Sequence, residues 1–317
     1  MPQRTSYVYR SSIGILLFST FIGSQTSACS VKTLAVGTTS KILLDAQPAL
    51  KQEPDYDLAA QAIPASLKTV EGFHFADPSN ERITRILAEG YCQYAVGFIE
   101  DLFERAHIND DLDEADYLAQ RATKSYLRCV GYSLELLGDD WQEKFLEPMA
   151  SVAPLIEAAG SDKRDAMLFL AVGLGGAINL NKDDIAMLEH IPKVKKLLKR
   201  VIAIDKDSPP SDPFLAALPH IGLGRIHTST PPALGGKPEL GKKHFEKAFA
   251  MTNKRLLLAQ VYLARSYAVA TQKQSLFRKL LVRVLKTDPA IWPEQRLANE
   301  IAHRRARLYL KHEKDWF

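Results

Sequence analysis

Cys29 is the residue whose chemistry is best defined by its neighbours in the sequence. It follows the small residues Ser27 and Ala28, and an apolar stretch at 13–23 with two arginines before it. This order of basic, apolar and small segments is that of a secretory leader. A thiol at this point is a substrate for lipid transfer and then for signal peptidase II. The sequence therefore predicts a lipoprotein signal peptide at 1–29, with Cys29 as a lipid-bearing N-terminus.

Two other fates of the leader remain open, because Thr26 stands where a lipobox usually has Leu. An ordinary signal peptidase would cut after Ala28, or the uncleaved leader would serve as an anchor. Either route still exports the chain. Ser30 occupies the position where inner-membrane lipoproteins often carry Asp. In a Gram-negative host we therefore expect a lipid anchor in the outer membrane, facing the periplasm.

Two glycine-rich segments have the spacing of nucleotide-binding motifs but lack their context. Residues 236–243 (GKPELGKK) have a GxxxxGK skeleton, yet Lys243 replaces the Ser or Thr that binds magnesium, and a Pro-rich loop precedes them instead of a strand. The run GLGGA at 173–177 lies within an expected helix, so we interpret it as close helix packing. We predict no nucleotide and no other cofactor.

Nothing in the sequence pairs a nucleophile with a base, and no HExxH, GxSxG or paired CxxC motif occurs. His220 and His227 share a helical face, but no carboxylate joins them at ligand spacing, so we expect packed or surface histidines and no metal. Glu100 and Glu104 are expected to form a solvated helix edge. A hydrolase site covered by the segment 138–162 would lack a visible acid/base pair. We therefore predict that the chain is not an enzyme.

The composition is that of an ordinary globular protein, with 46% hydrophobic and 25% charged residues. The formal net charge of +4 falls to +2 when the two leader arginines are removed. Basic residues crowd the last helix, but acidic residues are interspersed and no aromatic platform accompanies them, so nucleic-acid binding is not predicted. About 288 residues remain after the leader, enough for a sizeable core.

Cys92 and Cys129 fall on two consecutive expected helices, at similar distances from the turn between them. Their side chains could therefore meet. In an oxidising periplasm a disulfide would contribute about 3 to 4 kcal/mol by the loop-entropy estimate. Two free thiols packed as small core residues are the other interpretation that the sequence allows.

Helical periodicity is nearly continuous from residue 57 onward, and strand alternation is nearly absent, so we predict an all-α body. Residues 30–56 are expected to be a tether that contains a short helix at 41–52. The predicted helix pairs are 80–105 with 113–137, 163–179 with 184–204, 213–227 with 239–251, and 255–271 with 274–286, followed by a capping helix at 294–314. The first helix should begin at Ser79 or Asn80 and bury a stripe of Ile83, Leu87, Tyr91, Tyr94, Phe98 and Leu102.

The spacing of these pairs is typical of a divergent helical repeat. The segment 241–251 (GKKHFEKAFAM) has a small, aromatic, small triplet, and an apolar triplet starts at Phe277, 36 residues after Gly241. A tetratricopeptide repeat has a period of about 34 residues. We therefore predict that 57–317 is a single domain, a superhelical stack of about four tetratricopeptide-like hairpins with capping helices.

Several segments also match, in combination, one known family. In the last part of the chain the matching residues are Ala264, Tyr267, Ala268, Val269, Gln272, Phe277, Leu281, Asp288, Arg296, Leu297, Ala298, Asn299, Arg304, Arg305, Ala306, Arg307 and Phe317. Upstream, IPASLKTVE, LAEGYCQYAVGFIEDL, the RAxxxYLR pattern at 121–128 and HFEKAF agree. Together they span about 57–317 and resemble the T-component family of tripartite ATP-independent periplasmic (TRAP) transporters, the TatT-like lipoproteins.

The resemblance implies a periplasmic lipoprotein of tetratricopeptide-like hairpins that forms a trimer. It also implies pairing with the solute-binding P-component and a channel in each protomer for an apolar or carboxylate ligand. Carried over to this sequence, the candidate ligand- or partner-binding residues are Gln272, Arg296, Asn299, Arg304 and Arg305. An amide both donates and accepts, and Arg offers a planar fork to a carboxylate. For Asn299, Arg304 and Arg305 the alternative is a structural role, in which the arginine side chains bridge helix ends or carbonyls.

Three tyrosines could line such a channel or simply pack in the core: Tyr91, Tyr94 and Tyr126. We therefore expect a lipid-tethered subunit that docks a periplasmic solute-binding protein and helps to deliver its ligand, a small organic or apolar molecule. The alternative is a tetratricopeptide-type scaffold for outer-membrane or envelope assembly, which would use the same concave surface on a different client.

Overall fold

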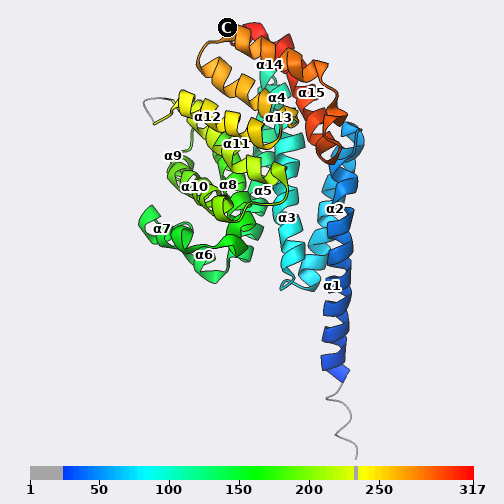
Figure 1. The fold of residues 1–317 in the computed structure, drawn as a ribbon. Helices are drawn as coiled ribbons and strands as arrows, with labels where there is room; N and C mark the ends of the chain where they lie inside the picture. The colour runs from blue at the N-terminus through cyan, green and yellow to red at the C-terminus, as the bar shows by residue number, and fades with distance from the viewer. Residues whose placement is uncertain (1–23, 232–234) are drawn as a thin grey trace, which may run out of the picture.

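The structure is a computed structural model that describes residues 24–231 and 235–317, with side chains from residue 32 onward. This part of the chain is helical and contains no strand (Figure 1). The predicted all-α class is therefore confirmed. The leader residues 1–23 and the Cys29 side chain lie outside what is described.

Two N-terminal helices run along one flank of the molecule, α1 (Ser24–Lys51) and α2 (Tyr56–Ala76) (Figure 1). Helix α1 is much longer than the short helix that the sequence predicted at 41–52. It is extended because Val36 and Ser40 are buried against the neighbouring helices. Asp55 begins α2, since its carboxylate accepts from the N–H groups of the first turn.

The next helices form the first predicted pair. It consists of α3 (Glu81–Tyr94), a single π-helical turn (Ala95–Ile99) and α4 (Glu100–Ile108), which pack against α5 (Leu112–Leu137). Asn80 caps α3 as predicted, by accepting from Ile83 N–H at 3.3 Å. Cys92 on α3 and Cys129 on α5 form a disulfide with their Cα atoms 5.4 Å apart, which decides between the two interpretations left open by the sequence.

The remaining helices follow the predicted order. The Pro-interrupted segment forms α6 (Asp139–Lys144) and α7 (Met149–Ala158). After these come α8 (Arg164–Leu180), α9 (Ile185–Leu188), α10 (Ile191–Asp207), α11 (Pro213–Ser229), α12 (Pro238–Met251), α13 (Leu257–Leu263) with a second π-helical turn (Ala264–Ala268), α14 (Gln274–Lys286) and α15 (Arg296–Lys311). Short 3₁₀ turns lie at Ser161–Lys163, Pro289–Ile291, Pro293–Gln295 and Glu313–Asp315.

The helices stack largely in chain order. In this stack α5 lies between α3 and α8, α8 between α5 and α10, and α11 between α10 and α12, while α13, α14 and α15 close the C-terminal end. Each predicted pair is present as neighbouring helices. Of the helices in the described ranges, none is both long and apolar enough to cross a bilayer.

The π turn between α3 and α4 changes which side chains face the core. One extra residue in a helical turn rotates everything after it by about 100° relative to a regular helix. Leu102, a member of the predicted stripe, is therefore 41% exposed, whereas Glu100 and Asp101 are buried. The prediction that Glu100 belongs to a solvated helix edge is wrong for this reason.

Candidate functional site

Charged and hydroxyl-bearing side chains from five helices meet inside the stack. We call this group the interior polar cluster, and it consists of Glu100 (α4), Tyr126 (α5), Arg225 (α11), Tyr262 (α13) and Arg305 (α15). Burying ions is costly unless they are paired and hydrogen-bonded. The contacts of each member therefore indicate whether it is occupied by the protein or free for a ligand.

Glu100 is occupied on both of its oxygens. The Tyr126 hydroxyl donates to Glu100 Oε1 at 2.6 Å, and Arg305 Nη2 lies 3.8 Å from Oε2. Glu100 is only 2% exposed. Burial, followed by the nearby Glu100 carboxylate, raises the pKa of the Tyr126 hydroxyl well above its usual value, so this hydroxyl stays a donor.

Arg305 is 1% exposed and also engaged by the protein. Its Nη2 donates to the carbonyl of Val96 in the first π turn, and its Nη1 donates to the Tyr262 hydroxyl at 3.4 Å. Burial acts to lower the pKa of Arg305, but Glu104 and other neighbours outweigh it, so the pKa lies well above its usual value. A π turn is frequently found at a functional site. Here it presents a carbonyl that fixes a buried cation.

Arg225 differs from the rest of the cluster. Its guanidinium lies over the Tyr262 ring, 4.6 Å from the centroid, and the side chain is partly exposed. Within the residues that the structure describes, it donates no hydrogen bond and forms no ion pair. Burial acts to lower its pKa, but Glu100 and the two tyrosines raise it above the usual value, so the group is a permanent cation. Its donors are available to a ligand.

Further charged side chains lie around the interior polar cluster. Glu104 accepts from the Tyr309 hydroxyl, and Arg265 lies over the rings of Tyr309 and Trp316. Lys182, in the turn after α8, has its pKa lowered by burial and then by Arg225 and Arg265. Around the cluster, four cations (Lys182, Arg225, Arg265 and Arg305) therefore face two carboxylates (Glu100 and Glu104). The excess of positive charge favours an anionic ligand such as a carboxylate.

The structure brings two of the predicted site residues, Tyr126 and Arg305, into this cluster. Asn299 lies elsewhere and is fully buried: its Oδ1 accepts from Leu257 N–H at 2.9 Å, and its Nδ2 donates to the carbonyls of Arg255 and Pro289. It ties the start of α13 to the turn before α15. This arrangement matches the structural alternative stated for these residues.

The remaining predicted residues also lie outside the cluster. Arg304 pairs with the buried Asp101, Arg296 with Glu300, and Gln272 donates to the carbonyls of Val269 and Trp316. The Tyr91 hydroxyl donates to Glu71 at 2.6 Å, and Tyr94 packs beside Phe98.

Sequence reasoning missed the other three members, Glu100, Arg225 and Tyr262. Arg225 did carry a signal, because it is the one fully charged residue of α11, a helix that is otherwise rich in apolar and small residues (PFLAALPHIGLGRIHTS). Such a residue must either reach solvent or pair in the interior. Glu100 gave no comparable signal, because the π turn that rotates it inward is not visible in the spacing.

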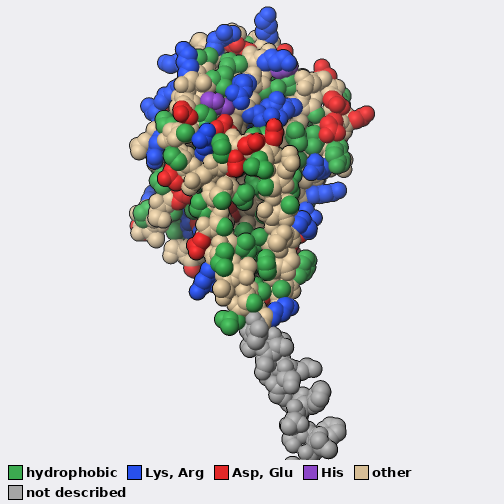
Figure 2. All heavy atoms as spheres, turned by 90° about the vertical axis from the view of Figure 1, so that its right-hand side faces the viewer, with side chains coloured by type: hydrophobic (Ala, Val, Ile, Leu, Met, Phe, Trp, Pro, Cys, Tyr) green, Lys and Arg blue, Asp and Glu red, His purple; other side chains and the backbone are tan. Residues whose placement is uncertain are grey.

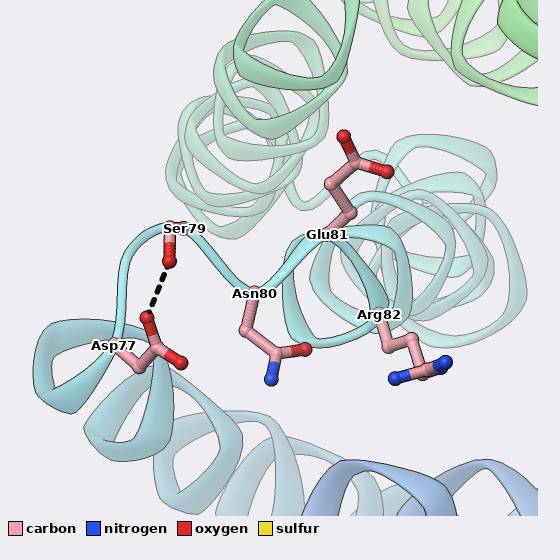
Figure 3. Close-up of a pocket in the computed structure, with 5 residues that line it drawn as sticks. All are labelled: Asp77, Ser79, Asn80, Glu81 and Arg82. Carbon is pink, nitrogen blue, oxygen red and sulfur yellow. Dashed lines mark hydrogen bonds between the residues drawn. The ribbon is translucent and has the colours of Figure 1, made fainter. Parts of the chain in front are cut away.

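A hollow at the turn between α2 and α3 is an alternative site (Figure 3). It is lined by Asp77, Ser79, Asn80, Glu81 and Arg82. The Ser79 hydroxyl donates to Asp77 Oδ1 at 2.7 Å, and Asn80 caps α3, so the polar groups here build the turn. Nowhere in the described part of the chain do three or more His, Cys, Asp or Glu side chains gather as a metal site.

The described residues thus form an all-helical body around an interior cluster of charged and hydroxyl-bearing side chains. The family model for the TRAP transporter T-component matches residues 52–317, and the chain belongs to that family. An uncharacterized protein of Treponema pallidum (strain Nichols) is 23% identical over 310 residues, which is 92% of this chain and 94% of that protein. The resemblance noted in the sequence is thus confirmed, and membership of this family associates the chain with TRAP transport.

Proposed function

We propose that the chain is a lipid-anchored periplasmic T component that binds the carboxylate of a small organic ligand in the interior polar cluster. It would exchange this ligand with the solute-binding protein of its transporter. The observation that carries the proposal is Arg225, a partly exposed interior cation without a hydrogen-bond or ion-pair partner in the described chain. Family membership supplies the context of transport.

The other members of the cluster support this role for Arg225. Glu100 is held by Tyr126 and Arg305, so it does not form a close ion pair with Arg225. The contact of the guanidinium with the Tyr262 ring holds Arg225 beside the cluster, while its N–H groups have no hydrogen-bond partner in the described structure. A carboxylate could then accept two parallel hydrogen bonds. Lys182 adds positive charge near the same site and would attract anions towards it.

Calorimetric titration with mono- and dicarboxylates tests the binding step. We expect Arg225→Gln to weaken binding of the best ligand by about tenfold to a hundredfold, since a charge-assisted bidentate contact contributes roughly 1.5 to 3 kcal/mol. Arg283→Gln, an exposed arginine on α14, is the matched control and should bind as the parent does. Equal binding by the parent and Arg225→Gln would contradict the proposal.

Association with partners is the second part of the proposal. Large apolar side chains are exposed on the α1–α2 flank, namely Leu34, Ile42, Leu58 and Phe75, and Figure 2 shows hydrophobic side chains gathered over the lower part of this face. Such surfaces often mark protein–protein contacts. We propose the solute-binding protein as the partner of this flank, and a homotrimer as the oligomeric state that the family resemblance implies.

Sedimentation of the purified chain with the solute-binding protein of its transporter tests this association. We expect a complex at micromolar concentrations, and Phe75→Asp should weaken it. Leu146→Asp, which changes an equally exposed side chain between α6 and α7, is the control. Native mass spectrometry of the chain alone gives the number of copies. If no complex formed at these concentrations, the solute-binding protein would not be the partner of the α1–α2 flank.

A further inference from the structure

Three histidines meet on the face of the molecule formed by α11 and α12. Nδ1 of His220 lies 2.9 Å from Nδ1 of His244, and the ring of His227 is stacked on that of His244 with centroids 6.1 Å apart. His220 and His227 lie on one side of α11, seven residues apart, and both are buried. His227 Nδ1 is a buried nitrogen without a hydrogen-bond partner in the described structure.

Four lysines are near enough to act electrostatically on these rings: Lys195 and Lys199 on α10, Lys237 before α12, and Lys247 on α12. The backbone N–H of Lys237 donates to the carbonyl of His227 at 2.9 Å, which fixes this lysine beside the rings. Lys195 and Lys199 are one helical turn apart, and Lys247 follows His244 by three residues, so each pair shares a face.

None of these four lysines forms an ion pair, as far as the described residues go, although their neighbours in sequence do. Lys196 lies 2.5 Å from Glu157, and Lys242 lies 3.5 Å from Glu246. The positive charge beside the histidines is therefore left without a carboxylate. A buried nitrogen without a partner is costly, and so is a group of like charges. A bound anion would relieve both.

We infer that His220, His227 and His244 with the four lysines form a binding site for a small multivalent oxyanion of the sulfate or phosphate type. Its place is on α10, α11 and α12. A metal cation does not fit, because the described histidines and carboxylates do not assemble three ligands there and the lysines repel cations. More than one negative charge is needed to balance four ammonium groups, and a tetrahedral oxyanion can accept from several donors at once.

The charges also predict how the site responds to pH. Burial first, and then His244 and the lysines, lower the pKa of His220 and His227 to about 4. The pKa of His244 is lowered by burial and then by Lys247 and Lys199. The groups that act on the three rings are these lysines and the rings themselves, with no carboxylate among them. An anion raises these pKa values when it binds, so by linkage its affinity increases as the pH falls.

Titration with sodium sulfate tests the site, because sulfate keeps its charge between pH 5 and 8 and any pH dependence then belongs to the protein. The readouts are calorimetry and the histidine ring signals in NMR spectra, at an ionic strength held constant with chloride. We expect sulfate to shift ring signals of this cluster and to bind more tightly at pH 5 than at pH 8. In Lys195→Gln/Lys199→Gln we expect at least tenfold weaker binding.

Lys196→Gln is the matched control, since this lysine lies on the same helix but is paired with Glu157. It should bind sulfate as the parent does. The inference would be overturned if chloride shifted the histidine ring signals as much as sulfate does. It would also be overturned if Lys196→Gln weakened sulfate binding as much as Lys195→Gln/Lys199→Gln. Binding only to acidic proteins or to anionic vesicles would overturn it as well. In Arg225→Gln the sulfate-dependent shifts of the histidine ring signals should persist, so this readout is independent of the proposed ligand site.

Discussion

At the scale of single residues, the polar side chains of the interior fall into two groups. In the first, every strong donor or acceptor has a protein partner, as in Asn299 and Asp101. In the second, polar groups remain without a partner in the described structure, as in the Arg225 guanidinium and Nδ1 of His227. Buried polar groups are satisfied in the great majority of cases. The unsatisfied ones are therefore the better guides to ligand sites, and the satisfied ones to stability.

Asn299→Ala tests this division. The substitution leaves the buried Leu257 N–H without its acceptor and two carbonyls without a donor, so we expect the free energy of unfolding to fall by about 2 to 3 kcal/mol. Urea unfolding followed by circular dichroism measures it. Ligand binding at the interior polar cluster should persist. In Asn109→Ala, where the side chain is exposed, the change should stay within about 0.5 kcal/mol.

At the scale of helices, close approach and π turns decide where the site forms. The two π turns, Ala95–Ile99 and Ala264–Ala268, adjoin helices that carry cluster members. The glycine-rich run GLGGA at 173–177 on α8 allows α8 to pack closely against α5. The ring of Tyr126 fills the space beside Gly176, and this packing directs the tyrosine hydroxyl towards Glu100. The expected role of this run in helix packing is confirmed.

Two neighbouring glycines on α8 make a matched pair for testing this packing. A Cβ at Gly176 would lie 2.3 Å from Cζ of Tyr126, so Gly176→Ala should destabilise the fold by about 1 to 3 kcal/mol and displace the hydroxyl. At Gly175 the nearest atom would be Val194 Cγ1 at 3.5 Å, an ordinary contact. Gly175→Ala should therefore be neutral or stabilising by up to about 1 kcal/mol. Similar losses in both variants would contradict the packing argument.

At the scale of the whole molecule, α1 determines how the body would stand relative to a membrane. The helix runs without interruption from Ser24 to Lys51, so the distance from Cys29 to its end is about 33 Å at 1.5 Å per residue. In Figure 1 the first turns of α1 project beyond the body. If Cys29 carries lipid as proposed, the connection is a helix for most of its length and not a flexible tether.

Cys29→Ser tests the anchor. In cells that process lipoproteins, we expect the parent to require detergent for extraction and the variant to lack the acyl mass on its N-terminus. Cell fractionation and mass spectrometry of the purified chain are the measurements. Cys92→Ala/Cys129→Ala removes the other two cysteines and should remain lipid-bearing. An unmodified N-terminus in the parent would refute lipidation and leave the two other fates of the leader.

The amino-acid sequence by itself determined the helical class, the pairing order of the helices and the family, because these depend on periodicity, caps and motifs that are local in the chain. It did not determine the site. Glu100 and Arg225 are far apart in sequence, and they meet only because a π turn rotates one inward and helix stacking brings the other beside it. The Cys92–Cys129 pairing was likewise decided by how α3 packs on α5. Burial and pairing of ions are properties of neighbours in space, and those neighbours exist only in the tertiary structure.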